Sequence, residues 1–127
     1  MEQETCILFY PNVSKRDVFE IKMILKRIGR IMGECVVDSV TNDQISAHCN
    51  SLEDEPRYQE LTERFVGRKV IVLKVHGENI IQKVRDATSG RPVLASDTEK
   101  GAKQEIDTWF HPGRLAFEKT AQMAATK

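Results

Sequence analysis

Val70-Ile71-Val72-Leu73-Lys74-Val75 is the clearest strand in the chain and the best starting point for its fold class. Five of its six residues are apolar, and a short apolar run of this kind is typical of a strand. Gly77-Glu78-Asn79 follows and predicts the start of a helix through Ile80, Ile81 and Val84. A strand that leads directly into a helix indicates a fold of mixed α and β elements.

The first forty residues predict a strand, a helix and a second strand. Thr5 to Tyr10 is an apolar run closed by a turn signal, which is typical of a buried strand. Ser14 is a candidate cap for a helix whose apolar residues recur at helical spacing, namely Val18, Ile21, Ile24, Leu25 and Ile28. Gly29 or Gly33 would end this helix, and Cys35 to Val40 contains the β-branched residues that favour a strand.

Three further helices and one weak strand complete the chain. Thr41-Asn42-Asp43 predicts a helix start, and Pro56 separates that helix from a second short one that ends near Val66. Thr98 to Trp109 predicts the last long helix. Arg91 to Ala95 is the only candidate for a fourth strand.

This order of elements predicts an α+β fold, a ferredoxin-like sandwich in which an antiparallel sheet carries its helices on one face. The length of 127 residues suits a single domain, with a core over about residues 5–115. The tail at 116–127 is rich in Ala, Lys and Thr, and we expect it to be flexible.

The charge balance excludes several classes of partner. Lys+Arg and Asp+Glu are both 19, so no basic surplus favours nucleic acid or an anionic membrane. No apolar run is long enough for a signal peptide or a membrane span. The three cysteines, Cys6, Cys35 and Cys49, have no CxxC spacing, which favours reduced thiols over a metal site or a reactive thiol. We therefore expect a cytoplasmic protein without cofactor or metal.

The segment Leu94-Ala95-Ser96-Asp97-Thr98 and the residues after it resemble the signature of the nucleoside diphosphate kinases. The later matching positions are Ala102, Glu105, Ile106, Trp109, Phe110 and Pro112. Further pieces resemble the same family in the right order: Tyr10-Pro11-Asn12, Glu20-Ile21 with Lys26-Arg27 and Gly33, Glu53 to Tyr58, and Val70 to Asn79. The resemblance runs from about Thr5 to Leu115, and it implies the same sandwich fold.

The resemblance also implies that most active-site positions are changed. Leu94 replaces the histidine that carries the phosphoryl group in the family, and leucine has no lone pair to attack a phosphate. Other family ligands of the nucleotide are replaced by Tyr10 for a lysine, Cys49 for a tyrosine, Glu55 for an arginine and Arg57 for the phenylalanine that stacks on the base. Arg85 matches a family arginine near the phosphates. Glu105 matches the glutamate that orients the histidine, and we expect it to have nothing to orient here.

The connection before Leu94 is short. Only eight residues separate Arg85 from Leu94, where the family has a long excursion, so roughly twenty residues are absent from this loop. In the family that loop supports hexamers, so we expect a monomer or dimer. The family's dimer contact corresponds to about Lys15 to Val40, where Ile31, Met32 and Val36 could bury area against a second copy or against a different partner. Of these, Val36 is expected in the internal core.

Each of these residues also has a purely structural interpretation. Leu94 could pack in the core, Trp109-Phe110 could anchor the end of the last helix, and Arg85 and Arg91 could be solvated surface residues. The histidines His48, His76 and His111 lie in no matching motif. The resemblance and its changed positions therefore imply a protein that is not an enzyme but an interaction subunit of an assembly, with a ciliary or cytoskeletal context implied by the resemblance alone. The alternative is a nucleotide-binding protein, or a kinase with an atypical site, that uses Arg57 and Arg85.

Overall fold

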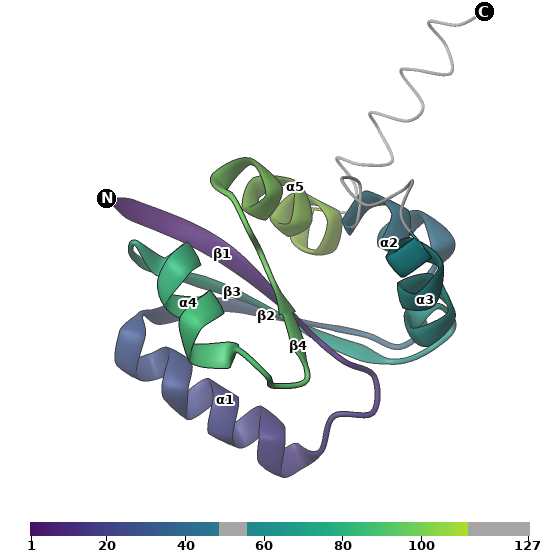
Figure 1. Ribbon diagram of the computed structural model, residues 1–127, viewed down its shortest axis with the longest axis horizontal. Helices are drawn as coiled ribbons and strands as arrows, with labels where there is room; N and C mark the ends of the chain where they lie inside the picture. The colour runs from purple at the N-terminus through teal and green to yellow at the C-terminus, as the bar shows by residue number, and fades with distance from the viewer. Residues whose placement is uncertain (49–55, 112–127) are drawn as a thin grey trace, which may run out of the picture.

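The chain folds into a four-stranded antiparallel sheet with helices packed against it, which confirms the predicted α+β sandwich (Figure 1). The computed structural model describes residues 1–48 and 56–111, without the side chains of residues 56–58. The strands are β1 (Glu2–Phe9), β2 (Arg30–Val37), β3 (Val70–Glu78) and β4 (Val93–Ala95). The helices are α1 (Lys15–Ile28), α2 (Asn42–His48), α3 (Pro56–Phe65), α4 (Ile80–Thr88) and α5 (Glu99–Phe110).

The apolar stretch at 70–75 forms the first two thirds of β3, an inner strand of the sheet. The strand order is β2-β3-β1-β4, so β3 pairs with β2 on one side and β1 on the other. The candidate fourth strand is confirmed as β4, whose Leu94 pairs with Leu8 of β1. The sheet therefore ends in two edge strands, β2 and β4.

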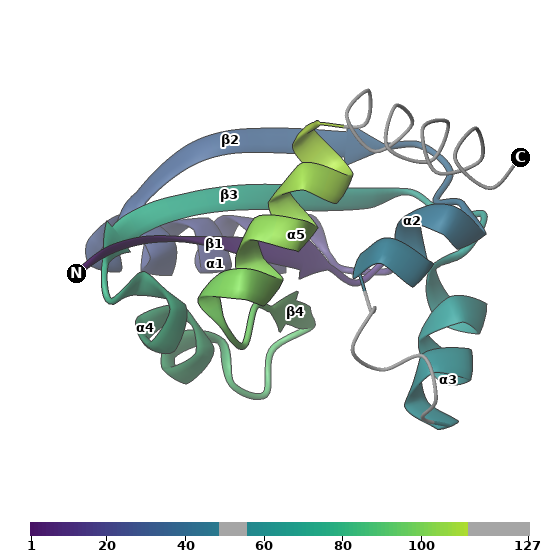
Figure 2. The same ribbon diagram turned by 90° about the horizontal axis from the view of Figure 1, so that it is seen from above.

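The prediction that the helices cover one face of the sheet is wrong, because they cover both (Figures 1 and 2). Helices α1 and α4 pack on the face to which β1 directs Ile7 and Phe9. Helices α2, α3 and α5 pack on the opposite face, to which β1 directs Cys6 and Leu8. Because successive side chains of a strand point to opposite faces, a strand covered on both sides is apolar throughout, as β1 is from Cys6 to Phe9.

The predicted helix ends agree with the capping contacts. Ser14 caps α1 by accepting a hydrogen bond from the Asp17 backbone N–H at 3.0 Å, and the helix ends at Gly29 rather than Gly33. Thr41 and Gln44 exchange side-chain and backbone hydrogen bonds at the start of α2. These short-range contacts explain why the helix starts could be predicted from the sequence.

The exposure of Val36 and of the cysteines differs from one residue to the next. Val36 is not a core residue, because half of it is exposed on edge strand β2. Cys6 is buried and Cys35 partly buried, both as free thiols, while Cys49 and the tail at 116–127 lie outside the described residues. Within the described ranges, no helix is both long and apolar enough to cross a membrane.

Candidate functional site

A pocket of about 710 Å³ opens beside β4, between the end of α4 and the first turns of α5. Helix α2 contributes His48 to its wall and α3 contributes Leu61. The pocket also collects Leu94, Arg85 and Glu105, three of the positions that the family resemblance singled out. The remaining lining residues are Thr88 to Arg91, Val93, Ala95, Asp97, Thr98, Lys100, Gly101 and Gln104.

A short connection positions Arg91 at one end of this pocket. Helix α4 ends at Thr88, and Gly90 adopts a positive φ of 78° that lets the chain turn back toward the sheet. The Arg91 backbone N–H then donates to the Thr88 carbonyl at 3.0 Å, and β4 begins two residues later. Arg91 therefore lies near the start of β4, whereas the Arg85 side chain lies beside Asp97, beyond the end of that strand.

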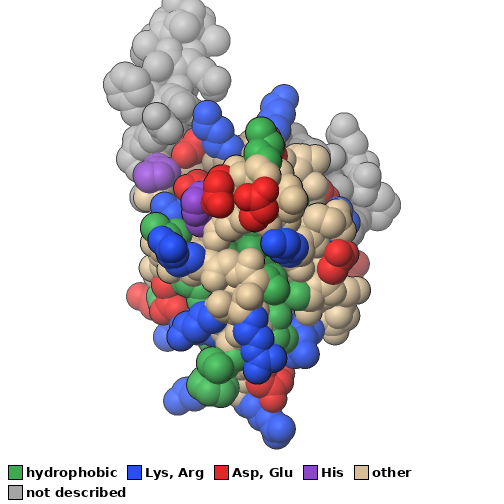
Figure 3. Space-filling view, turned by 90° about the vertical axis from the view of Figure 1, so that its left-hand side faces the viewer, with side chains coloured by type: hydrophobic (Ala, Val, Ile, Leu, Met, Phe, Trp, Pro, Cys, Tyr) green, Lys and Arg blue, Asp and Glu red, His purple; other side chains and the backbone are tan. Residues whose placement is uncertain are grey.

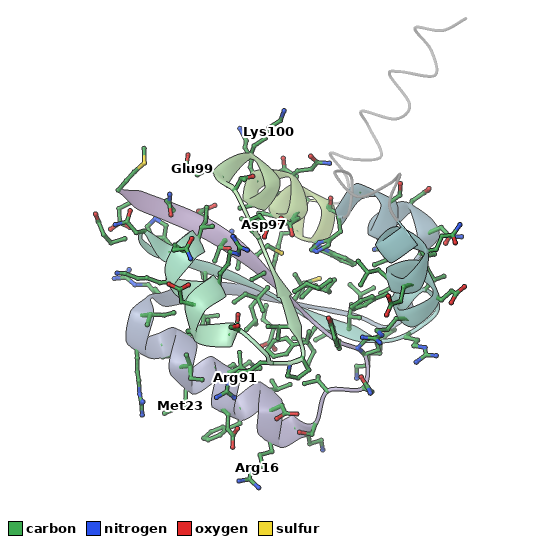
Figure 4. The ribbon with its side chains drawn as sticks, viewed as in Figure 1. Arg16, Met23, Arg91, Asp97, Glu99 and Lys100 are labelled. Atoms are coloured by element: carbon green, nitrogen blue, oxygen red, sulfur yellow. The ribbon has the colours of Figure 1, made fainter. Side chains whose placement is uncertain are left out.

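The pocket carries three cations, Arg85, Arg91 and Lys100. Arg85 Nε lies 3.4 Å from Asp97 Oδ1, and an Arg91 guanidinium nitrogen lies 3.7 Å from Glu20 Oε2. These partners are exposed, so such ion pairs contribute little and leave the guanidinium groups available to a ligand. Figure 4 shows Arg91 near the turn before β4, with Lys100 and Asp97 at the opposite end of that strand.

Leu94 lies in β4 on the wall of the pocket. It is partly buried and packs against the core cluster of α2, α3 and α5, so its structural interpretation is confirmed. Its side chain offers the pocket an apolar surface and no nucleophile.

Glu105 does have a partner, so the expectation that it has nothing to orient is wrong. Its Oε1 lies 3.2 Å from Nε2 of His48, which comes from α2 rather than from β4. Glu105 is only 8% exposed, and this burial raises the pKa of its carboxyl from 4.5 to about 7. A hydrogen bond from Ser96 opposes this shift, and the nearby charge of Asp97 adds to it.

The hydrogen bonds of His48 determine which ring nitrogen carries its proton. The indole Nε1–H of Trp109 donates to His48 Nδ1 at 2.9 Å, and an indole nitrogen can only donate. Nδ1 therefore carries the lone pair, and Nε2–H donates to Glu105. Burial also lowers the pKa of His48 to about 4, so the ring is neutral at physiological pH. The contact between His48 and Glu105 is thus a hydrogen bond to a carboxyl group, not an ion pair.

His48 lies in no matching motif, so the motifs offered no reason to place it at the site. One signal was present: a buried tryptophan needs an acceptor for its N–H, and Trp109 is only 3% exposed. The same burial confirms Trp109 as an anchor at the end of α5.

The other predicted positions lie away from the pocket or outside the described residues. Tyr10 follows β1, where its ring meets the Phe65 ring edge-on at 5.6 Å and the Arg64 guanidinium at 5.1 Å. His76 Nε2 lies 3.3 Å from Glu2 Oε2, where β3 ends beside the start of β1. His111 is exposed and follows α5. The positions outside the described residues are Cys49, Glu55 and the side chain of Arg57. Among the described residues, no cluster of three or more potential ligands could hold a metal ion.

Comparison with known proteins confirms the resemblance. The chain is 26% identical over 140 residues to a nucleoside diphosphate kinase of Streptomyces avermitilis, covering 91% of this chain and all of the relative. It is 25% identical over 136 residues to a nucleoside diphosphate kinase of Staphylococcus carnosus, covering 90% and 91%. The first alignment has more positions than the chain has residues, so the relative carries residues without a counterpart here. No family model matches the chain.

Solved structures show the same fold. The nucleoside diphosphate kinase of Aquifex aeolicus superposes with a TM-score of 0.69 at 16% identity, over 85% of this chain and 94% of that one. A nucleoside diphosphate kinase family protein from Babesia bovis gives a TM-score of 0.67 at 17% identity, over 87% and 90%. The chain therefore has the fold of the nucleoside diphosphate kinases.

These relatives contradict the interpretation that the chain is not an enzyme. Proteins matched over nine tenths of the chain carry the name of an enzyme. The leucine at position 94 removes one side chain, and this change does not by itself show that activity is lost. The pseudoenzyme interpretation is therefore withdrawn.

Proposed function

We propose that the chain binds a nucleoside di- or triphosphate in the pocket beside β4, as a protein similar to nucleoside diphosphate kinases with an atypical site. The observation that carries this proposal is the placement of Arg85, Arg91 and Lys100 around one pocket of about 710 Å³. Guanidinium groups bind phosphate oxygens in a bidentate manner, and a lysine adds a point charge. Pockets of several hundred Å³ are the usual size for ligands of this class.

Helix α5 adds to the attraction for phosphate. Its first turn, with Lys100 and Gly101, lines the pocket, so the positive end of the helix dipole is directed toward a bound anion. Asp97 and Glu105 also line the pocket and oppose an anion. Because two carboxylates offset part of the charge of three cations, we expect binding of about −4 to −6 kcal/mol, which corresponds to a Kd between about 1 mM and about 40 μM.

Phosphoryl transfer between nucleotides is the reaction to measure, because the relatives are named for it. Leu94 supplies no nucleophile, and both ring nitrogens of His48 are occupied by Trp109 and Glu105. The geometry thus supports nucleotide binding more directly than it identifies a phosphorylated residue. Binding and transfer should be assayed on the same preparation, with ATP as donor and a second nucleoside diphosphate as acceptor.

The test of binding is calorimetric titration with ADP in the presence of magnesium. Arg91→Ala and Lys100→Ala should each weaken binding about fivefold to tenfold, or about 1 kcal/mol, because each removes one cation from the pocket. Lys103→Ala is the matched control, since Lys103 is exposed on the same helix and does not line the pocket. Absence of ADP binding, or equal losses in all three variants, would contradict the proposal.

We also infer that a second copy of the chain covers α1 and edge strand β2. Apart from Met1, the exposed large hydrophobic residues in the described ranges all lie on these two elements: Phe19 at 65%, Met23 at 41%, Met32 at 52% and Val36 at 50% exposure. An edge strand also presents unpaired backbone groups to a partner. None of these four residues lines the pocket, although Arg91 of the pocket contacts Glu20 of α1. The ciliary context remains a prediction.

A further inference from the structure

Glu105 is a buried carboxylate in the wall of the pocket, and phosphate binding as proposed above does not use it. It faces His48 from α2, Ser96 and Asp97 from the segment after β4, and Cys6 from β1. On its own helix, Lys100 and Gln104 also line the pocket. Arg85, the cation on α4, lies against Asp97. No described cation lies within ion-pair distance of the Glu105 carboxylate, apart from the titratable ring of His48.

His48 cannot neutralise Glu105 at physiological pH. The Trp109 N–H occupies His48 Nδ1, so the ring already carries its proton on Nε2 and donates it to Glu105 Oε1. A second proton on the ring would have to displace the tryptophan N–H from Nδ1, where the His48 side chain is only 5% exposed. Negative charge added to the pocket therefore changes the protonation of the Glu105 carboxyl and not that of the His48 imidazole.

We infer that Glu105 takes up one proton when a phosphate dianion occupies the pocket, so that nucleoside phosphates bind more tightly as the pH falls through neutrality. This inference rests on the proposed nucleotide binding. A dianion placed near a poorly solvated carboxylate repels it strongly, and protonation of the carboxylate removes that repulsion. Burial has already brought the pKa of Glu105 to about 7, so little additional repulsion is needed for protonation near neutral pH.

The proton comes from solvent and binds Oε2 of Glu105. Oε1 accepts from His48, whereas Oε2 lies next to Gly101, where a Cβ atom would approach it to 3.5 Å. Gly101 and Glu105 both line the pocket. No covalent bond changes, and the proton returns to solvent when the phosphate leaves.

The test measures proton uptake by calorimetry in two buffers that differ in ionisation enthalpy, between about pH 6 and pH 8. The ligand is the β-thiophosphate analogue of ADP, because its terminal group stays ionised over this range while that of ADP titrates. Wild-type protein should take up a measurable fraction of one proton per ligand above pH 7, and its affinity should rise, by at most about tenfold per unit, as the pH falls. Glu105→Gln should bind the analogue more tightly at pH 8 and show neither effect.

Glu99→Gln is the matched control, because it removes a carboxylate from the exposed first turn of the same helix and does not line the pocket. It should retain the proton uptake of the wild type. Binding without proton uptake in the wild type, or uptake that persists in Glu105→Gln, would overturn this inference and leave the proposed function intact. A lack of binding by both proteins at every pH would instead overturn the proposed function and the inference together.

Discussion

At the scale of single residues, Glu105 has hydrogen-bonding neighbours although position 94 is a leucine. A buried carboxylate without hydrogen-bond donors would cost several kcal/mol, so its neighbours must supply them. Here the donors are His48 from α2 and Ser96 from the segment after β4. Trp109 completes the chain of hydrogen bonds by determining which ring nitrogen of His48 carries the proton.

The raised pKa of Glu105 predicts how stability depends on pH. A carboxyl whose pKa is 4.5 when unfolded and about 7 when folded stabilises the folded state below pH 4.5, and this contribution is lost as the pH rises through 7. Glu105→Gln keeps an acceptor for His48 and cannot ionise. Its free energy of unfolding relative to the wild type should therefore increase by about 1 kcal/mol between pH 6 and pH 8.

Urea denaturation of both proteins at the two pH values measures this difference. His48 has the opposite tendency, because its pKa is lowered from 6.5 to about 4 and its contribution is lost as the pH falls through that window. That term is common to both proteins and cancels in the comparison. A difference that does not change with pH would show that Glu105 is ionised normally in the folded protein.

At the scale of elements, the join between α1 and β2 depends on a close approach at Gly29. A Cβ atom there would lie 2.6 Å from Ile80 Cδ1 and 2.8 Å from the His76 carbonyl oxygen. The second of these neighbours belongs to the backbone of β3, so it can move only if the strand itself is displaced. Gly29 thus ends α1 and also lets the chain pass against β3 and the start of α4.

Gly29→Ala should destabilise the protein by about 2 kcal/mol or more, because overpacking against backbone forces neighbouring elements apart. Gly67→Ala is the matched control. Gly67 has a positive φ of 79°, but a Cβ atom there would meet nothing within 4 Å, so only the cost of about 1 kcal/mol for that backbone conformation applies. Thermal unfolding of the two variants compares them directly. Equal losses would mean that the contacts of Gly29 relax without cost.

At the scale of the whole molecule, the numbers of basic and acidic residues are equal. Among the described residues, the large exposed hydrophobic side chains other than Met1 lie on α1 and β2. Figure 3 shows basic and acidic side chains interspersed over one face, with hydrophobic side chains exposed among them. The net charge of zero gives little repulsion between copies. The exposed hydrophobic residues of α1 and β2 are therefore the surface at which association is expected.

We expect a dimer by light scattering, in equilibrium with monomer as the protein is diluted. Val36→Asp should shift this equilibrium toward monomer, because it places a charge in an apolar contact that must exceed about 1,000 Å² to be specific. Gln59→Asp introduces the same charge on exposed α3 and should leave the equilibrium unchanged. A hexamer, or a wild-type monomer at every concentration, would contradict the proposed surface.

The sequence by itself determined the elements and their order. Apolar runs such as 70–75, and caps such as Ser14 and Thr41, act within a few residues and are visible without a structure. The family resemblance also indicated the positions of Leu94, Arg85 and Glu105, which the fold brings to one pocket.

Only the tertiary structure decided which face of the sheet each helix covers and which side chains meet. The distribution of α1 and α4 on one face and of α2, α3 and α5 on the other depends on how the strands are ordered, and local periodicity does not contain that order. The contact between His48 and Glu105 joins residues 57 positions apart in the chain. Their hydrogen bond, and the pKa of about 7 that burial imposes on Glu105, arise only when packing removes water from both groups.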